Sequence, residues 1–171
     1  MHPAVIRPVE AQDITPLYEI NEAAVPGVSS VTREALTRLV FDFADVIFVA
    51  VQNQVPVGFV LCLIEGQQAY NNLNYAWVSD HYVTFAYVDR IAVAKTARGM
   101  GIGGQLYEKV FLHYNGRRPV LMAEVYLKPP NPGSLRFHRR MGFRSTGIER
   151  WEKDGSKGVV FLERSLLGGG D

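Results

Sequence analysis

A glycine-rich loop at residues 98–104 constrains the fold of this chain more than any other feature. Its sequence is Arg-Gly-Met-Gly-Ile-Gly-Gly, and it lies between an apolar, strand-like run over 84–93 and an amphipathic helical pattern over 103–114. Glycine lets the backbone approach an anion closely because no Cβ intervenes. The start of the following helix directs unpaired N–H groups and the positive end of its dipole to the same place. The loop therefore predicts a site for the phosphates of a nucleotide-containing cofactor.

An apolar run over 120–126 completes a unit of strand, loop, helix and strand. Such a unit normally forms a right-handed crossover between parallel strands, and its ligand binds at the carboxyl end of the first strand. We therefore expect a mixed α/β fold with the loop at the functional edge of the sheet.

The flanking segments predict further helices and strands. Helical spacing predicts one helix over 13–24, capped by Asp13, and a second that begins after Thr32 and extends to Phe43. Apolar runs over 46–52 and 56–65, separated by a polar turn, predict an antiparallel hairpin. A short helix over 134–141 and a strand pair over 143–151 and 158–164 are expected to close the fold.

Residues 66–82 are rich in aromatic and amide side chains but show no clear period, so we expect a long loop. Two interpretations remain open for its aromatic residues. They either line a substrate pocket or cover the edge of the sheet. If they line a pocket, the candidate substrate-binding residues are Tyr75, Trp77 and Tyr82.

Composition limits the class of protein. The 171 residues, 47% hydrophobic and 20% charged, predict a single domain over 1–166 with a flexible tail over 167–171. A net charge of +1 argues against a nucleic-acid or anionic-membrane partner. The longest apolar runs are far shorter than the ~20 residues that a membrane span needs. The only cysteine, Cys62, lies in such a run, and we expect it to be a packing residue of a cytoplasmic protein.

Three kinds of glycine loop fit parts of this pattern. A P-loop requires Lys and then Ser or Thr after the last glycine, whereas Gly104 is followed by Gln105 and Leu106. The dinucleotide fingerprint G-x-G-x-x-G is present, with Glu124 about twenty residues downstream. However, residues 94–98 separate the strand from the glycines, and too little chain follows for a full set of crossovers. An NAD(P)-binding oxidoreductase is therefore a secondary hypothesis.

The third kind of loop fits two motifs together. Arg98, Gly101 and Gly103 resemble the R-x-x-G-x-G acetyl-coenzyme A signature of the GCN5-related N-acetyltransferase (GNAT) superfamily. Downstream, the segment from Asn131 to Phe143 resembles that superfamily's N-x-x-(A/S)-x-x-F-Y-x-x-x-G-F motif with the same spacing. This resemblance, which covers nearly the whole chain, implies a mixed central sheet of about six to seven strands flanked by about four helices.

The resemblance also implies acetyl-CoA as cofactor, with its pyrophosphate on the loop amides and its pantetheine arm along the preceding strand. The implied cofactor-binding residues are Ile91, Ala92, Val93, Arg98, Gly99, Met100, Gly101, Ile102, Gly103, Gly104, Asn131, Ser134, Phe137 and His138. No metal is expected. The implied reaction is direct attack of a primary amine on the thioester through a tetrahedral intermediate.

Such a reaction needs a group that takes the proton from the ammonium, and Glu124 is the first candidate. It is a charged residue within an apolar strand, and ribosomal-protein N-terminal acetyltransferases have a similar L-E-V segment, although with a shorter spacing to the asparagine. The alternative is a glutamate at the sheet surface or one in a structural ion pair with Arg90. Asp89 is the second candidate, because strand alternation places Asp89 and Arg90 on opposite faces and so directs one of them to the active site.

His138 stands where the superfamily usually has a tyrosine that protonates the leaving thiolate. It is a candidate for the same role or for the base, and the alternative is a packing residue that contacts the cofactor. The replacement of the tyrosine is also compatible with a catalytically silent acyl-CoA sensor. The nearly uncharged aromatic segment favours a small amine or amino-acid-like acceptor, and the resemblance is compatible with a homodimer.

Overall fold

The structure, a computed structural model, describes residues 3–168, which form two compact units. Unit 1 comprises the chain up to Leu63 together with Asp89–His113, and unit 2 comprises Ile64–Val88 together with the chain from Tyr114 onward. Neither unit is a continuous stretch, because the chain passes between them after residue 63, within strand β4 (Ala86–Val93) and after residue 113. Of the tail expected over 167–171, residues 169–171 lie outside the described part.

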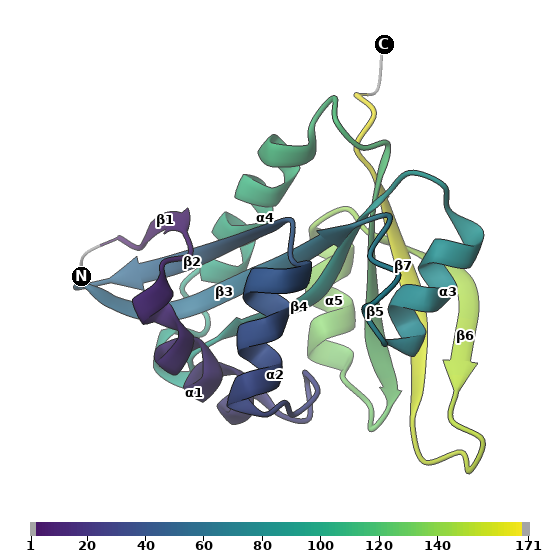
Figure 1. Cartoon of the computed structure of the whole chain (residues 1–171), viewed down its shortest axis with the longest axis horizontal. Helices are drawn as coiled ribbons and strands as arrows, with labels where there is room; N and C mark the ends of the chain where they lie inside the picture. Colours follow the sequence, from purple (N-terminus) through teal and green to yellow (C-terminus); the bar gives the residue numbers. More distant parts are fainter. Residues whose placement is uncertain (1–2, 169–171) are drawn as a thin grey trace. The chain divides into compact units, whose positions relative to one another are not determined.

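Seven strands form one sheet in the order β1-β2-β3-β4-β5-β7-β6 (Figure 1). Their bounds are β1 Val5–Pro8, β2 Val46–Gln52, β3 Val55–Ile64, β5 Val120–Lys128, β6 Arg144–Trp151 and β7 Gly158–Ser165, in addition to β4. The β4–β5 pair is parallel, with Ala86 opposite Leu121, whereas β1–β2, β2–β3, β5–β7 and β6–β7 are antiparallel. The predicted mixed α/β fold and the parallel crossover are thereby confirmed.

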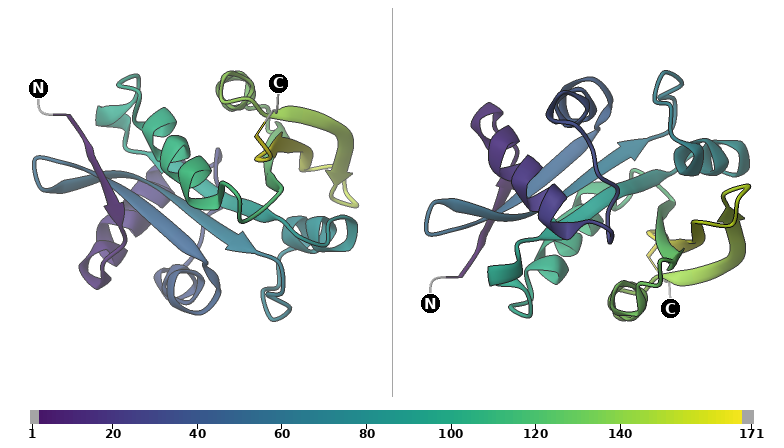
Figure 2. Two further views of the ribbon diagram at one scale, coloured as in Figure 1. Left: turned by 90° about the horizontal axis from the view of Figure 1, so that it is seen from above. Right: turned by 90° about the horizontal axis from the view of Figure 1, so that it is seen from below.

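In unit 1, helices lie on both faces of strands β2 and β3. Figure 2 shows α1 (Ile14–Ala24) and α2 (Arg33–Arg38) on one face and α4 (Ile102–Tyr114) on the other. Leu17, Leu36, Phe59, Leu106 and Val110 supply fully buried side chains to this unit. The apolar stripe of each helix therefore faces the sheet, as the sequence spacing predicts.

Short irregular turns adjoin these helices. A 3-10 turn at Ala11–Asp13 precedes α1, a π turn at Leu39–Phe43 continues α2, and a 3-10 turn at Lys95–Ala97 follows β4. Thr32 caps α2 as predicted, since its hydroxyl accepts a hydrogen bond from the Ala35 amide at 3.1 Å. The predicted polar turn of the β2–β3 hairpin is also confirmed.

The prediction that the side chain of Asp13 caps helix α1 is wrong, because this side chain makes no capping hydrogen bond. Asp13 does stand at the N-terminus of α1, but its buried carboxylate accepts two hydrogen bonds from Arg7, at 2.7 and 2.9 Å, and one from the Glu10 amide at 2.7 Å. It thus ties the end of β1 to the start of α1. Sequence spacing could not show this, because the cation comes from a short strand that the sequence pattern did not predict.

Asp13→Asn should lower the free energy of unfolding by about 2 kcal/mol at pH 7, because charge-assisted hydrogen bonds from Arg7 are lost. These bonds hold the pKa of Asp13 below its usual value. The stabilisation is therefore complete above the unfolded-state pKa of about 3.9 and is lost as the pH falls through the lower folded-state pKa. Urea titrations at several pH values measure this difference, which should shrink only below about pH 4. Asp42→Asn, which affects an exposed ion pair with Arg38, is the control and should leave stability unchanged.

In unit 2, residues 66–82 are not the long loop that the sequence predicts, because α3 (Leu73–His81) forms within them. Asn72 caps this helix by accepting hydrogen bonds from the amides of Asn74 and Tyr75, both at 3.0 Å. Only Tyr75 and Val78 of the helix are buried, so the sequence shows no apolar stripe of helical period. The cap was the one local signal for this helix.

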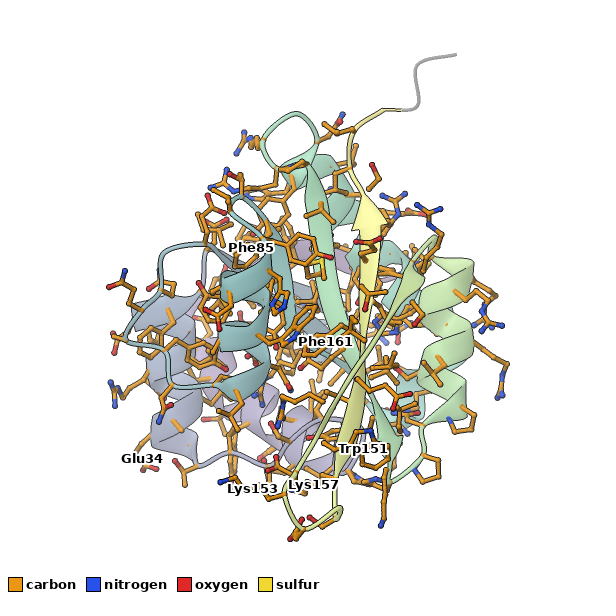
Figure 3. The ribbon with its side chains drawn as sticks, turned by 90° about the vertical axis from the view of Figure 1, so that its right-hand side faces the viewer. Glu34, Phe85, Trp151, Lys153, Lys157 and Phe161 are labelled. Carbon is orange, nitrogen blue, oxygen red and sulfur yellow. The ribbon has the colours of Figure 1, made fainter. Side chains whose placement is uncertain are left out.

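The other helix of unit 2, α5 (Pro132–Arg140), and the β6–β7 hairpin follow the predicted pattern. Figure 3 shows Phe161 in the middle of β7 and Trp151, Lys153 and Lys157 at the hairpin end. The hairpin turns at Asp154 and Gly155, as predicted, where Gly155 has a φ of 68°. None of the helices in residues 3–168 is long and apolar enough to cross a membrane.

Candidate active site

The glycine-rich loop of unit 1 has the backbone geometry of an anion cradle. Gly99 and Gly101 have φ angles of 77° and 78°, which side-chain-bearing residues rarely adopt, and α4 begins at the next residue, Ile102. Apart from the chain neighbours of each glycine, no described residue has an atom within 4 Å of a Cβ added at either position. Arg98 donates a hydrogen bond from Nε to the Val93 carbonyl at 3.1 Å and so joins the loop to the end of β4. The loop therefore leaves open space at two glycines next to the N-terminus of α4, as a site for an anion requires.

Gly58 of β3 is a part of this arrangement that sequence reasoning missed. A Cβ at this position would lie 3.1 Å from the Ala92 carbonyl oxygen, 3.3 Å from Val93 and 3.4 Å from Ile102. Gly58 thus lets β3, the end of β4 and the start of α4 approach one another closely. An isolated glycine in a strand pattern was the available signal.

In unit 2, Glu124 on β5 lies at the centre of a polar network. Its Oε1 accepts hydrogen bonds from the Tyr87 hydroxyl at 2.9 Å and from Asn74 Nδ2 at 3.2 Å. Asn74 Oδ1 in turn accepts from Arg150 Nε at 2.8 Å, and Arg150 Nη1 lies 3.4 Å from Glu152. Glu124 is half-buried, so this carboxylate is held by defined donors in a site of limited water access.

Asp89 is held differently. Its Oδ2 accepts a hydrogen bond from Arg90 Nε at 2.7 Å, and the two side chains are only 1% and 4% exposed. Arg90 also donates to Asn21 Oδ1 at 2.9 Å and to the Ser29 carbonyl at 3.3 Å. Strand alternation predicts that Asp89 and Arg90 point apart, whereas the structure joins them in one buried ion pair. This pair ties β4 to α1 and to the segment that follows α1.

His138 on α5 is 4% exposed and packs edge-on against Phe143, with ring centroids 5.2 Å apart. Its Nδ1 lies 2.9 Å from the Ser134 carbonyl oxygen, which only accepts hydrogen bonds, so Nδ1 carries a proton. Burial lowers the pKa of His138. The neutral imidazole is therefore the dominant form at neutral pH. Asn131 caps the same helix by accepting from the Ser134 amide at 3.2 Å.

Comparison with known proteins decides the family. The family model described as "Acetyltransferase (GNAT) family" matches residues 14–143, which include the glycine loop and the Asn131–Phe143 motif. This chain belongs to the GNAT family. Among curated proteins, none matches this GNAT chain in sequence.

Solved structures share the fold of this GNAT chain at low sequence identity. The ribosomal-protein-S18-alanine N-acetyltransferase from Escherichia coli is 17% identical with a TM-score of 0.73, over 98% of this chain and 97% of that one. Ard1 from Thermoplasma volcanium is 20% identical with a TM-score of 0.76, over 97% and 99%. Arabidopsis thaliana NAA60 in complex with acetyl-CoA is 18% identical with a TM-score of 0.71, over 95% and 98%. At these identities the likeness shows the fold alone.

The three aromatic residues expected to bind substrate in this GNAT chain have partners within unit 2. Tyr75 is buried and donates its hydroxyl to the Ile64 carbonyl at 2.6 Å. Trp77 stacks on Phe161 at a centroid distance of 4.0 Å, and Tyr82 donates to Glu163 at 2.9 Å. These contacts favour the interpretation in which the aromatic side chains pack against the sheet.

Sequence reasoning also missed three members of the Glu124 network, namely Asn74, Tyr87 and Arg150. They come from α3, β4 and β6, and their positions depend on the strand order and on how α3 packs. Tyr87 offered a weak signal, because a tyrosine in an apolar strand needs a partner for its hydroxyl.

Proposed function

We propose that this protein is an acyl-CoA-dependent N-acetyltransferase that transfers an acetyl group from acetyl-CoA to a primary amine. The observation that carries the proposal is the loop ending at α4, where two glycines with positive φ leave an open cradle beside a helix N-terminus. Membership of the GNAT family supports the same conclusion.

The residues of the loop fit the pyrophosphate of acetyl-CoA. Amides of residues 99–104 and the start of α4 would hold its charge, since unpaired N–H groups and the helix dipole favour an anion. Backbone groups of Ile91 and Ala92 would hydrogen-bond the pantetheine arm in the manner of an added strand. On the motif match, Asn131, Ser134 and Phe137 would contribute further contacts to the cofactor. When bound, the cofactor supplies a thioester carbonyl that an amine can attack.

We assign Glu124 as the base that takes a proton from the acceptor ammonium. Hydrogen bonds from Tyr87 and Asn74 fix the orientation of its carboxylate before the acceptor arrives. Asp89 is a weaker candidate, because its carboxylate is engaged in a buried ion pair. His138 is better suited to a contact with the cofactor than to proton donation, since burial lowers its pKa.

We propose a small amine or amino-acid-like acceptor. The Glu124 network contains two carboxylates and one guanidinium, which is too little negative charge to favour a highly basic polypeptide tail. A protein N-terminus is the competing acceptor, and the assay must include it.

The purified protein, incubated with acetyl-CoA and a panel of amines, should release free thiol at a rate above the amine-free background. The panel contains free amino acids, amino-acid amides, polyamines and short peptides with free N-termini. Cys62 is fully buried, and burial raises the pKa of its thiol, so it should contribute little to a colorimetric thiol assay. Mass spectrometry of the acceptor identifies the acetylated product.

Two outcomes would contradict the proposal. A melting temperature raised by acetyl-CoA without thiol release from any acceptor would support the sensor hypothesis. A melting temperature raised by NAD(P) and not by acetyl-CoA would support an oxidoreductase instead.

A further inference from the structure

The Glu124 network contains an amide whose orientation is fixed by chemistry. Arg150 can only donate hydrogen bonds, so Asn74 must present its carbonyl oxygen to the guanidinium. The NH₂ group of Asn74 then has to face Glu124, where it lies 3.2 Å from Oε1. An ionised carboxylate only accepts hydrogen bonds, so this arrangement pairs a donor with an acceptor at both contacts of the Asn74 amide.

From this geometry we infer that Asn74 and Arg150 are positioning residues for Glu124. Arg150 sets the orientation of the Asn74 amide, and the amide places a donor on the carboxylate. This inference rests on the proposed function, because it assigns a purpose to holding Glu124 in one orientation. It gives α3 and β6, which flank β5 and β7 in unit 2, a role in the reaction.

The two groups that donate hydrogen bonds to Glu124 Oε1 differ in how freely they can rotate. The Tyr87 hydroxyl, on a fully buried side chain, can rotate to donate elsewhere or to accept, whereas the Asn74 amide is held at its other end by Arg150. Arg150 is itself held by Glu152 at 3.4 Å and is 24% exposed. The charged and titratable groups that the described contacts bring to Glu124 are thus Tyr87 directly, and Arg150 and Glu152 through Asn74. A donor whose direction is fixed holds the Glu124 carboxylate in one orientation and favours its ionised form.

Asn74→Asp tests this assignment without a known acceptor. The substitution keeps the shape of the side chain but replaces the donor by a second carboxylate 3.2 Å from Glu124. Aspartate is favourable in the first turn of a helix, so α3 should still form. The Glu124 carboxyl is followed by ¹³C NMR of protein labelled at glutamate side-chain carboxyls, and Glu124→Gln identifies its resonance. Its titration midpoint should rise by about one pH unit or more in Asn74→Asp.

Asn71→Asp is the matched control, because it adds the same charge in the same segment at an exposed position. It should leave the titration midpoint of Glu124 unchanged. A midpoint that does not move in Asn74→Asp, or that rises equally in both variants, would overturn the assignment.

Arg150→Met provides a second measurement should Asn74→Asp not fold. It frees the amide of Asn74 and should raise the same midpoint in the same direction by a smaller amount, whereas Arg150→Lys should restore part of the difference. An unchanged midpoint in Arg150→Met would remove Arg150 from the assignment. The absence of acetyl transfer by the unmodified protein would instead defeat the proposed function and leave the titration result standing, so the two failures are distinguishable.

Discussion

Glu124→Gln should lower the rate of acetyl transfer by about 100-fold or more, because a positioned general base contributes this much to a rate. Glutamine has nearly the same shape as glutamate, and its amide oxygen can accept the hydrogen bonds from Tyr87 and Asn74. The variant should therefore fold normally, yet it cannot take a proton from an ammonium. The thiol-release assay, with the best acceptor of the panel, measures the loss.

Binding of acetyl-CoA should be unchanged in Glu124→Gln, since the proposed cradle lies in the loop at residues 98–104. Isothermal titration calorimetry with acetyl-CoA tests this separation. Glu163→Gln is a matched control, because Glu163 is another half-buried carboxylate that accepts a tyrosine hydroxyl at 2.9 Å, from Tyr82. Equal activity in Glu124→Gln and the unmodified protein would exclude Glu124 as the base, and an equal loss in both variants would point to a general structural effect.

The sequence predicted those elements whose signals are local. Apolar runs rich in β-branched residues, separated by a two-residue polar turn, predict the β2–β3 hairpin, in which Asn53 and Gln54 adopt φ angles of 51° and 65°. The glycine loop was predictable for the same reason, because a positive φ and the absence of a Cβ are properties of the residues themselves. Glu124 was detectable because a charge within an apolar strand requires a partner.

Elements that depend on tertiary contacts were harder to predict. Strand β1 has only four residues and a terminal proline, and its place in the sheet comes from pairing with β2. Helix α3 buries few of its residues and packs through single side chains such as Trp77 on Phe161. Neither pattern has a period that identifies the element by itself.

The residues of the candidate site also differ in whether the sequence alone could identify them. The residues that would hold a phosphate follow one another in the chain, so their sequence identifies them. Asn74, Glu124 and Arg150 are separated by 50 and 26 positions, and they meet because α3 packs beside β7 while β6 occupies the sheet edge. Asp89 and Arg90 are neighbours in the sequence, yet the directions of their side chains could not be predicted from it. Strand alternation predicts that the two side chains point to opposite faces of the sheet, whereas they form a buried ion pair.

Gly101→Val should lower the affinity for acetyl-CoA by about 100-fold or more, a loss of about 2.7 kcal/mol. The φ of Gly101 is 78°, and a β-branched residue adopts such an angle only at a cost of about 1–2 kcal/mol. The loop would relax to another conformation, and its amides would no longer converge on the phosphates. A side chain would also project into the space that the cradle leaves open. Calorimetry with acetyl-CoA measures the affinity directly.

Gly147→Val is the control that separates the loss of affinity for acetyl-CoA from the effect of backbone strain on stability. Gly147 lies in β6 and has the same φ of 78°, and, apart from its chain neighbours, no described residue has an atom within 4 Å of an added Cβ. Both variants should therefore lose stability to a similar extent, which thermal unfolding monitors, but only Gly101→Val should lose the cofactor. Retained affinity in a folded Gly101→Val protein would show that acetyl-CoA binds without the conformation of this loop, and the assignment of residues 98–104 as the phosphate cradle would then be wrong.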